Sequence, residues 1–283
     1  MILRVFPRRS KQYTPDDRHA FVCEPPLWTP AAHRVSEVHI SVCFTWDKDR
    51  AERILKPSWE MLYPGKVRVG GPAYQSPCDT FTPCRYVKAG ITYTSRGCDD
   101  RCPWCLVPEW EGRLRTLDHI SPGRVVQDNN LLACPKAHRR RVYDMLAGVP
   151  TVQFKGGLAA GRLTAWDAAR LRSLRVNEMW FACDTVHRIG ALRKALRLLG
   201  GVSRNVLRCY VLCGFDAQET VEDAEARLVE VWEAGATPFC QLYRSPTEAK
   251  RREWPDEWRH LARAWSRPAA TKARARQLLG SAR

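Results

Sequence analysis

The sequence predicts an α/β fold in which helices cover a parallel sheet. From residue 91 to residue 266, strand-like and helix-like stretches alternate in six units. The strand-like stretches are largely apolar, which is typical of strands in a parallel sheet. Two of the helices begin with capping boxes that use aspartate as the acid, Thr164 with Asp167 and Thr220 with Asp223. Such units form right-handed crossovers and place ligands at the carboxyl ends of the strands.

The six units can be assigned in chain order. The first strand is expected at 91–96, directly before a group of cysteines. The later strands are expected at 124–130, 151–157, 178–184, 207–215 and 237–243. The helices that follow them are expected near 135–147, 165–174, 188–199, 221–234 and 256–266. Polar residues just past each strand are therefore the first candidates for a binding site.

A smaller unit precedes these repeats. Residues 1–34 contain several prolines and charges without sustained periodicity, so we expect an irregular lead-in in which 21–23 can form a short strand. The run VSEVHISVCFTW predicts a buried strand, Asp47 is placed to cap a helix over 48–63, and KVRV predicts a second strand. Residues 35–90 are thus a small, truncated Rossmann-like β-α-β segment with its linker. Its Gly70-Gly71 pair predicts a turn that needs positive φ.

Composition and charge bound the class of protein. A chain of 283 residues with 45% hydrophobic residues can bury a substantial core. We expect neither a secretion signal nor a membrane span, and therefore a cytoplasmic location without a membrane partner. Twelve cysteines in such a chain indicate reduced thiols and metal chemistry. The formal charge of +16 favours a nucleic acid or nucleotide as partner, and a merely solvated basic surface explains it nearly as well.

Three cysteines, Cys98, Cys102 and Cys105, follow the first strand at spacings that let one loop gather their sulfurs. Structural zinc sites close with four ligands, whereas a [4Fe–4S] cluster held by three cysteines keeps one iron open for another ligand. The alternative is a zinc loop with a fourth ligand such as His119. Zinc ribbons and fingers usually repeat their C-x2-C pair, and the sequence contains no second one. Cys78 and Cys84 can help bind a second iron–sulfur cluster, but we favour the interpretation that they are ordinary thiols in a loop.

The C-x3-C-x2-C spacing, with Trp104 just before the last cysteine, resembles the cluster loop of the radical S-adenosylmethionine superfamily. The flanking residues are similar to those of its methylthiotransferase branch: Ser95-Arg96-Gly97 before the cysteines, and Leu106-Val107-Pro108 and Gly112-Arg113 after them. Glu111 stands where that branch usually has an arginine. Methylthiolation itself is disfavoured, because the chain shows neither the usual amino-terminal three-cysteine domain nor room for an RNA-binding barrel.

This resemblance implies a partial (β/α)6 barrel over residues 91–266. It implies a [4Fe–4S] cluster on Cys98, Cys102 and Cys105 whose open iron binds S-adenosylmethionine. A one-electron donor of flavodoxin or ferredoxin type would then drive cleavage to a 5′-deoxyadenosyl radical that abstracts a substrate hydrogen. Residues 35–75 resemble the end of a cobalamin-binding domain, but they lack its Asp-x-His-x-x-Gly pattern, so bound cobalamin is not expected.

The resemblance and the strand ends together nominate residues that bind the cofactor. Asp128, Asn129 and Asn130 lie where related enzymes carry a Gly-Gln-Asn segment, although an Asx turn explains them about as well. Asp184 can accept hydroxyl groups of a ribose or cap the next helix. The other candidates are Trp104, Gly156, Gly157, Gln241 and Tyr243, with Arg96 and Arg113 beside the cysteines. No set of residues suggests hydrolysis, and the catalytic residues stay unassigned.

Residues 267–283 form a basic tail that can lie along nucleic-acid phosphates or simply fray. Two other functions stay open at this point: a zinc-stabilised nucleic-acid-binding protein without catalysis, and an iron–sulfur electron carrier.

Overall fold

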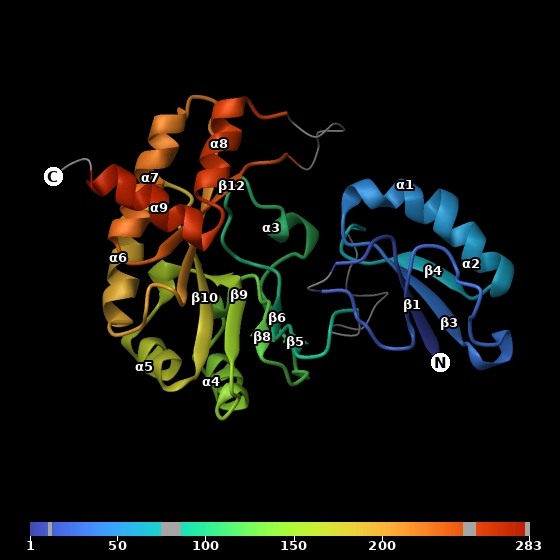
Figure 1. Ribbon diagram of the computed structural model, residues 1–283. Coiled ribbons are helices and arrows are strands. Elements are labelled where there is room, and N and C mark those ends of the chain that lie inside the picture. Colours follow the sequence, from blue (N-terminus) through green and yellow to red (C-terminus); the bar gives the residue numbers. More distant parts are fainter. Residues whose placement is uncertain (11–12, 75–85, 246–252, 281–283) are drawn as a thin grey trace.

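A computed structural model of the chain contains two parallel sheets, each with its own hydrophobic core (Figure 1). It describes residues 1–10, 13–74, 86–245 and 253–280. The predicted α/β class with parallel sheets is confirmed. The cysteines at 78 and 84, and with them the prediction about a second cluster, lie outside the described residues.

The larger sheet has six strands in the order β12-β11-β10-β9-β8-β5, and all neighbours are parallel. The strands are β5 (Ile91–Thr92), β8 (Val125–Val126), β9 (Val152–Leu158), β10 (Val176–Ala182), β11 (Leu207–Cys213) and β12 (Thr237–Leu242). Successive strands of this sheet are neighbours in it. Right-handed crossovers between such strands place the connecting helices on the same face.

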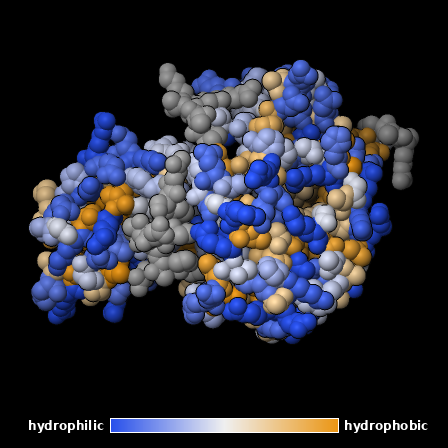
Figure 2. Space-filling view, turned by 180° about the vertical axis from the view of Figure 1, so that it is seen from behind, coloured by the Kyte–Doolittle hydropathy of each residue, from blue (hydrophilic) through white to orange (hydrophobic). Residues whose placement is uncertain are grey.

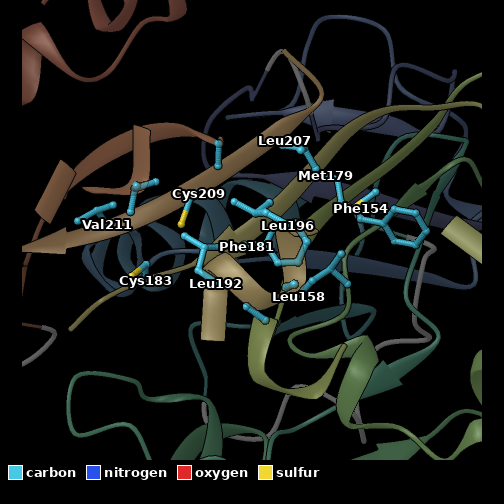
Figure 3. Packing of buried hydrophobic residues seen from close by; sticks show 14 of the residues in the cluster. Phe154, Leu158, Met179, Phe181, Cys183, Leu192, Leu196, Leu207, Cys209 and Val211 are labelled. Atoms are coloured by element: carbon cyan, nitrogen blue, oxygen red, sulfur yellow. The ribbon is translucent and has the colours of Figure 1, made fainter. Parts of the chain in front are cut away.

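The helices after the later strands lie close to their predicted positions. They are α4 (Lys136–Leu146), α5 (Ala165–Ser173), α6 (Ile189–Leu198), α7 (Val221–Glu233) and α8 (Asp256–Ala264). Both predicted capping boxes form, at the starts of α5 and α7. Figure 3 shows how Leu192 and Leu196 of α6 pack against Phe181 and neighbouring strand residues. Alternate strand residues therefore form one core with the helices.

The other face of the larger sheet is polar and aromatic. Lys155 and Glu178 form an ion pair at 3.2 Å, and the rings of Trp180 and Tyr210 stack with centroids 4.1 Å apart. Phe239 packs edge-on against both rings. Parallel strands are usually apolar on both faces, because protein covers both. A half-buried face of this composition is instead suited to contact water or a ligand.

The smaller sheet has the order β2-β1-β3-β4, again all parallel. Its strands are β1 (Ile2–Phe6), β2 (Ala20–Val22), β3 (Glu37–Ser41) and β4 (Val67–Gly70). The expectation of an irregular lead-in over 1–34 is therefore wrong, since β1 lies inside this sheet. Leu3 and Val5 are fully buried. Arg4 lies between these two residues and pairs with Asp17. Its charge interrupts the apolar run, so the sequence pattern did not predict a strand here.

The helix predicted at 48–63 is confirmed as three consecutive segments, α1 (Lys48–Arg50), the π-helical η3 (Ala51–Leu55) and α2 (Lys56–Leu62). Asp47 does not cap it, because its carboxylate accepts Nε of Arg8 at 2.7 Å instead. The turn at Gly71 is also confirmed. Its φ is +106°, and an added Cβ would lie 2.8 Å from the backbone nitrogen of Val42.

The predicted basic tail is in fact a helix, α9 (Pro268–Gly280). Its own Thr271 and Ala275 are buried, and its Arg274 pairs with Glu225 of α7 at 2.7 Å. Packing against the larger core, not charge alone, therefore orders this segment.

The remaining elements are short. They are β6 (Ser95–Arg96), β7 (Arg115–Thr116), α3 (Val107–Trp110), η1 (Ala32–Arg34), η2 (Thr45–Asp47), η4 (Leu131–Ala133), η5 (Ala160–Arg162) and η6 (Val186–Arg188). Within the described ranges, no helix has both the length and the apolar character needed to span a bilayer. The face seen in Figure 2 is mostly hydrophilic with scattered hydrophobic patches.

Candidate functional site

A cavity of about 920 Å³ lies at the carboxyl ends of the larger sheet. Gly157, Ala182, Leu212 and Gln241 line it from four neighbouring strands. Its size is in the range of sites for small molecules and cofactors. Parallel sheets of this kind bind their ligands at this edge, as the sequence predicted.

The three cysteines line this same cavity. They lie on a loop whose neck is closed by the antiparallel pairing of β6 with β7. Gly97 at the neck has a φ of +74°, and an added Cβ would lie 2.2 Å from the carbonyl oxygen of Arg113. The amide of Cys98 donates to the carbonyl of Gly112 at 3.2 Å. Only glycine fits at position 97, which explains its place directly before the first cysteine.

The loop brings three thiols, those of Cys98, Cys102 and Cys105, to one cavity. In the part of the chain that the structure describes, no three His, Cys, Asp or Glu side chains are arranged to hold one metal ion. His119, the suggested fourth zinc ligand, is exposed. The described residues thus bring three thiols to one cavity without forming a site for a single ion.

The thiols are only partly shielded from water: Cys98 and Cys102 are half-buried, and Cys105 is the most exposed of the three. Burial raises the pKa of Cys98, and hydrogen bonds from the Asp100 backbone and the Asn130 side chain offset part of that rise. Burial likewise raises the pKa of Cys105. Since thiolates are the metal ligands, loading of this site must release protons.

Arg188 was not identified from the sequence. It lies in η6, and its Nη2 donates to Sγ of Cys102 at 3.2 Å. The guanidinium also lies 5.8 Å from the ring centroid of Trp104. It brings positive charge to a sulfur that carries negative charge when it binds a metal. The only local signal was an arginine shortly after the strand that ends near Asp184.

Asp100 also holds the cysteine loop in place, through contacts with two other side chains. Asp100 accepts Nη2 of Arg162 at 2.6 Å and Nδ2 of Asn130 at 3.2 Å. Asn130 is only 4% exposed and lines the cavity. Its Oδ1 has no hydrogen-bond partner among the described residues. A buried acceptor of this kind is suited to a donor group on a bound ligand.

Glu111, near the end of the cysteine loop, contacts the residues at the start of that loop. Its carboxylate accepts the amide of Gly97 at 3.0 Å and Nδ2 of Asn129 at 2.7 Å, and it pairs with Arg96 at 3.0 Å. The residue that departs from the methylthiotransferase pattern is therefore an organising contact of this loop. Asn129 lines the cavity as predicted, while Arg96 is directed to Glu111 and Arg113 is 95% exposed.

Asp128 does not have its predicted place in the cavity. It is 1% exposed and accepts the amides of Thr94 at 2.6 Å and Ser95 at 3.1 Å, together with the Thr94 hydroxyl. That hydroxyl also contacts Nε2 of His138 at 3.0 Å. Burial raises the pKa of Asp128. The residue anchors the strand before the cysteines instead of holding a ligand.

The other predicted residues line the cavity, for different reasons. Gly156 is required because an added Cβ would lie 2.0 Å from the carbonyl oxygen of Asp128, so backbone packing and not a ligand explains it. Gly157, with a φ of +111°, leaves space beside it. Asp184 accepts the amide of Leu212 at 3.2 Å, and burial raises its pKa. Trp104 and Tyr243 both pack edge-on against Phe215. Gly156, Gly157, Asp184, Trp104 and Tyr243 all line the cavity.

The smaller sheet contributes to the same cavity through Cys43 and Pro72, which follow β3 and β4. Comparison with known proteins does not identify a family for this chain. No family model matches the chain, and no curated protein matches it.

Proposed function

We propose that this chain is a radical S-adenosylmethionine enzyme that carries one [4Fe–4S] cluster in a partial (β/α)6 barrel. One observation supports this most: the three cysteines of a C-x3-C-x2-C loop share a cavity with the carboxyl ends of parallel strands that follow one another in chain order. The polar inner face of the larger sheet is also what a ligand-filled barrel needs.

When bound, the cluster and S-adenosylmethionine would supply electron transfer and a carbon radical. The chain's own residues bind and orient. Cys98, Cys102 and Cys105 would hold the cluster, and Arg188 would balance charge at Cys102. The Oδ1 of Asn130 and the carboxylate of Asp184 offer acceptors for ammonium or hydroxyl donors. Trp104 and Tyr243 would add aromatic surface to the wall of the cavity around the bound groups.

The proposal extends to the partners. A nucleic acid or nucleotide is the proposed substrate, supported by the net charge of +16. A flavodoxin or ferredoxin in the cytoplasm is the proposed source of electrons.

Anaerobic reconstitution tests the proposal. The wild-type chain should take up about four iron and four sulfide and release 5′-deoxyadenosine only when dithionite and S-adenosylmethionine are present. The variants C98A, C102A and C105A should lose both properties. The control C23A changes a half-buried cysteine of the smaller sheet and should keep them.

Two results would contradict the proposal. One zinc per chain without cleavage would support the zinc-stabilised binder. A cluster that leaves S-adenosylmethionine intact under reduction would support an electron carrier.

A further inference from the structure

The smaller sheet has a switch in its strand order. In the order β2-β1-β3-β4, the chain moves from β1 to one side and then returns to the other side of β1. Open parallel sheets bind ligands outside the carboxyl ends of their strands at such a point. Here those ends lead into residues 7–10 after β1 and residues 42–47 after β3.

Two aromatic rings lie at this point. Phe44 and Trp46 stack with centroids 4.7 Å apart and planes within 7° of each other. Phe44 is 42% exposed and Trp46 is 64% exposed. Exposed rings of this size leave a large apolar area in water, so a parallel ring pair that is this exposed favours a binding role. We call these two residues the Phe44–Trp46 ring pair.

The ring pair is held by its neighbours. Arg8 lies 6.0 Å from the ring centroid of Phe44 and donates Nε to Asp47 at 2.7 Å. Asp47 is 4% exposed, so this ion pair fixes the end of the loop that carries the rings. Arg8 and the next residue, Arg9, are both exposed. Flat apolar faces and positive charges therefore occur together.

The ring pair also adjoins the cysteine-lined cavity. Cys43, the residue before Phe44, lines that cavity, as does Pro72 after β4. Tyr243 and the exposed Arg244 line it from the end of β12. Figure 1 shows the start of α1, directly after this loop, at the end of the smaller unit nearest α3. A molecule that stacks on the rings would have its next part close to the cavity.

We propose that the Phe44–Trp46 ring pair binds the bases of a single-stranded nucleic acid, with Arg9 contacting its phosphates and Arg8 holding the loop through Asp47. Stacking on aromatic rings combined with positive charge is how proteins hold single strands, because every base offers a flat face. The excess of positive charge in the chain favours this polyanion over an apolar protein partner. A role of the ring pair in presenting a nucleotide to the cavity rests on the proposed function. Binding of a single strand by the ring pair does not depend on it.

Fluorescence anisotropy tests this site with the full chain and a labelled single-stranded RNA of about 16 nucleotides, at fixed salt. Replacing Trp46 by alanine should weaken binding about tenfold, the effect of losing one stacked base. The matched control is Trp28→Ala, because Trp28 is 89% exposed and belongs to the same unit. That control should bind as the wild type does. Arg9→Ala should lower both the affinity and its dependence on salt, while Arg53→Ala should not.

Equal affinities of W46A and W28A, or no binding by the wild type, would overturn the site. The assay needs neither S-adenosylmethionine nor reductant, so it separates the two proposals. A loss of affinity in W46A but not in W28A, without cleavage of S-adenosylmethionine, would support the site and contradict the reaction. Cleavage with equal affinities of both tryptophan variants would do the reverse.

Discussion

The two parallel sheets differ in strand order, and that difference decides where each can bind a ligand. In the larger sheet, neighbours follow the chain from β5 to β12, so the helices share one face and the other face is left for a ligand. In the smaller sheet, the order reverses beside β1, which makes the carboxyl edge at that point the favoured place. Both edges contribute to the cysteine-lined cavity.

Charged side chains on a sheet face do not by themselves show which of the two sheets binds a ligand. The larger sheet has the Lys155–Glu178 pair, and the smaller has His39 with Glu37 at 2.9 Å. The face with Lys155 continues into the wall of the cavity through Gly157 and Ala182, and the smaller sheet reaches the same cavity through Cys43 and Pro72. The cavity and the strand ends, and not the charges, therefore identify the site.

The sharpest test of this comparison uses one glycine at each edge. Gly97→Ala should abolish cluster incorporation and destabilise the loop by about 2–4 kcal/mol, because the new Cβ meets the Arg113 carbonyl. Gly71→Ala should instead weaken binding of single-stranded RNA and leave the iron content unchanged, since its Cβ meets Val42. Iron analysis and anisotropy on both variants measure this.

The control is Gly112→Ala, at a φ of +78° with nothing within 4 Å of the added Cβ. It should cost only about 1 kcal/mol of stability and keep the cluster. Loss of both properties in both variants would mean that the two edges are not separate sites.

A second test concerns the anchor beneath the cysteines. Asp128→Asn should lower the free energy of unfolding by about 1–3 kcal/mol, because an amide cannot accept all the hydrogen bonds that the carboxylate accepts. Urea denaturation measures the loss. Glu109→Gln, at an exposed residue of α3, should have almost no effect. Equal midpoints for the two variants would contradict the anchoring role.

The pH dependence of stability should report on the same anchor. Burial lowers the pKa of His138, so between its folded and unfolded pKa values the unfolded chain binds more protons. Stability from this residue is therefore present above the ordinary histidine pKa and is lost as the pH falls below it. Unfolding measured at pH values of about 7.5 and about 5.5 should show a larger loss for the wild type than for His138→Gln.

The smallest effect is expected at the C-terminal helix. Arg274→Met removes the ion pair with Glu225 and should cost about 1 kcal/mol, while Arg276→Met, at an exposed position, should cost nothing measurable. Arg274 lowers the pKa of Glu225, so the stabilisation is present at neutral pH and is lost as the pH falls below the ordinary glutamate pKa. An unchanged melting temperature in the Arg274 variant would argue against docking of α9.

Residues close together in the sequence specified most of the secondary structure. Apolar strand runs, helical periodicity and the capping boxes act over a few residues, so the strands and helices from β8 to α8 occur close to where they were expected. The cysteine spacing likewise acts within one loop, and the structure places all three thiols in one cavity. The strand β1 was missed because a single paired arginine interrupts its apolar pattern.

Contacts between distant residues could be seen only in the tertiary structure. Arg188 reaches Cys102 across 86 positions of sequence, and Asp128 lies 34 positions from Thr94, whose amide it accepts. No periodicity or spacing encodes such pairs, because they depend on which strand ends meet at one edge of a sheet. The sequence by itself determined the elements and the cysteine loop. Tertiary packing decided that Asp128 supports the strand while Asn130 lines the cavity, because the chain turns between them.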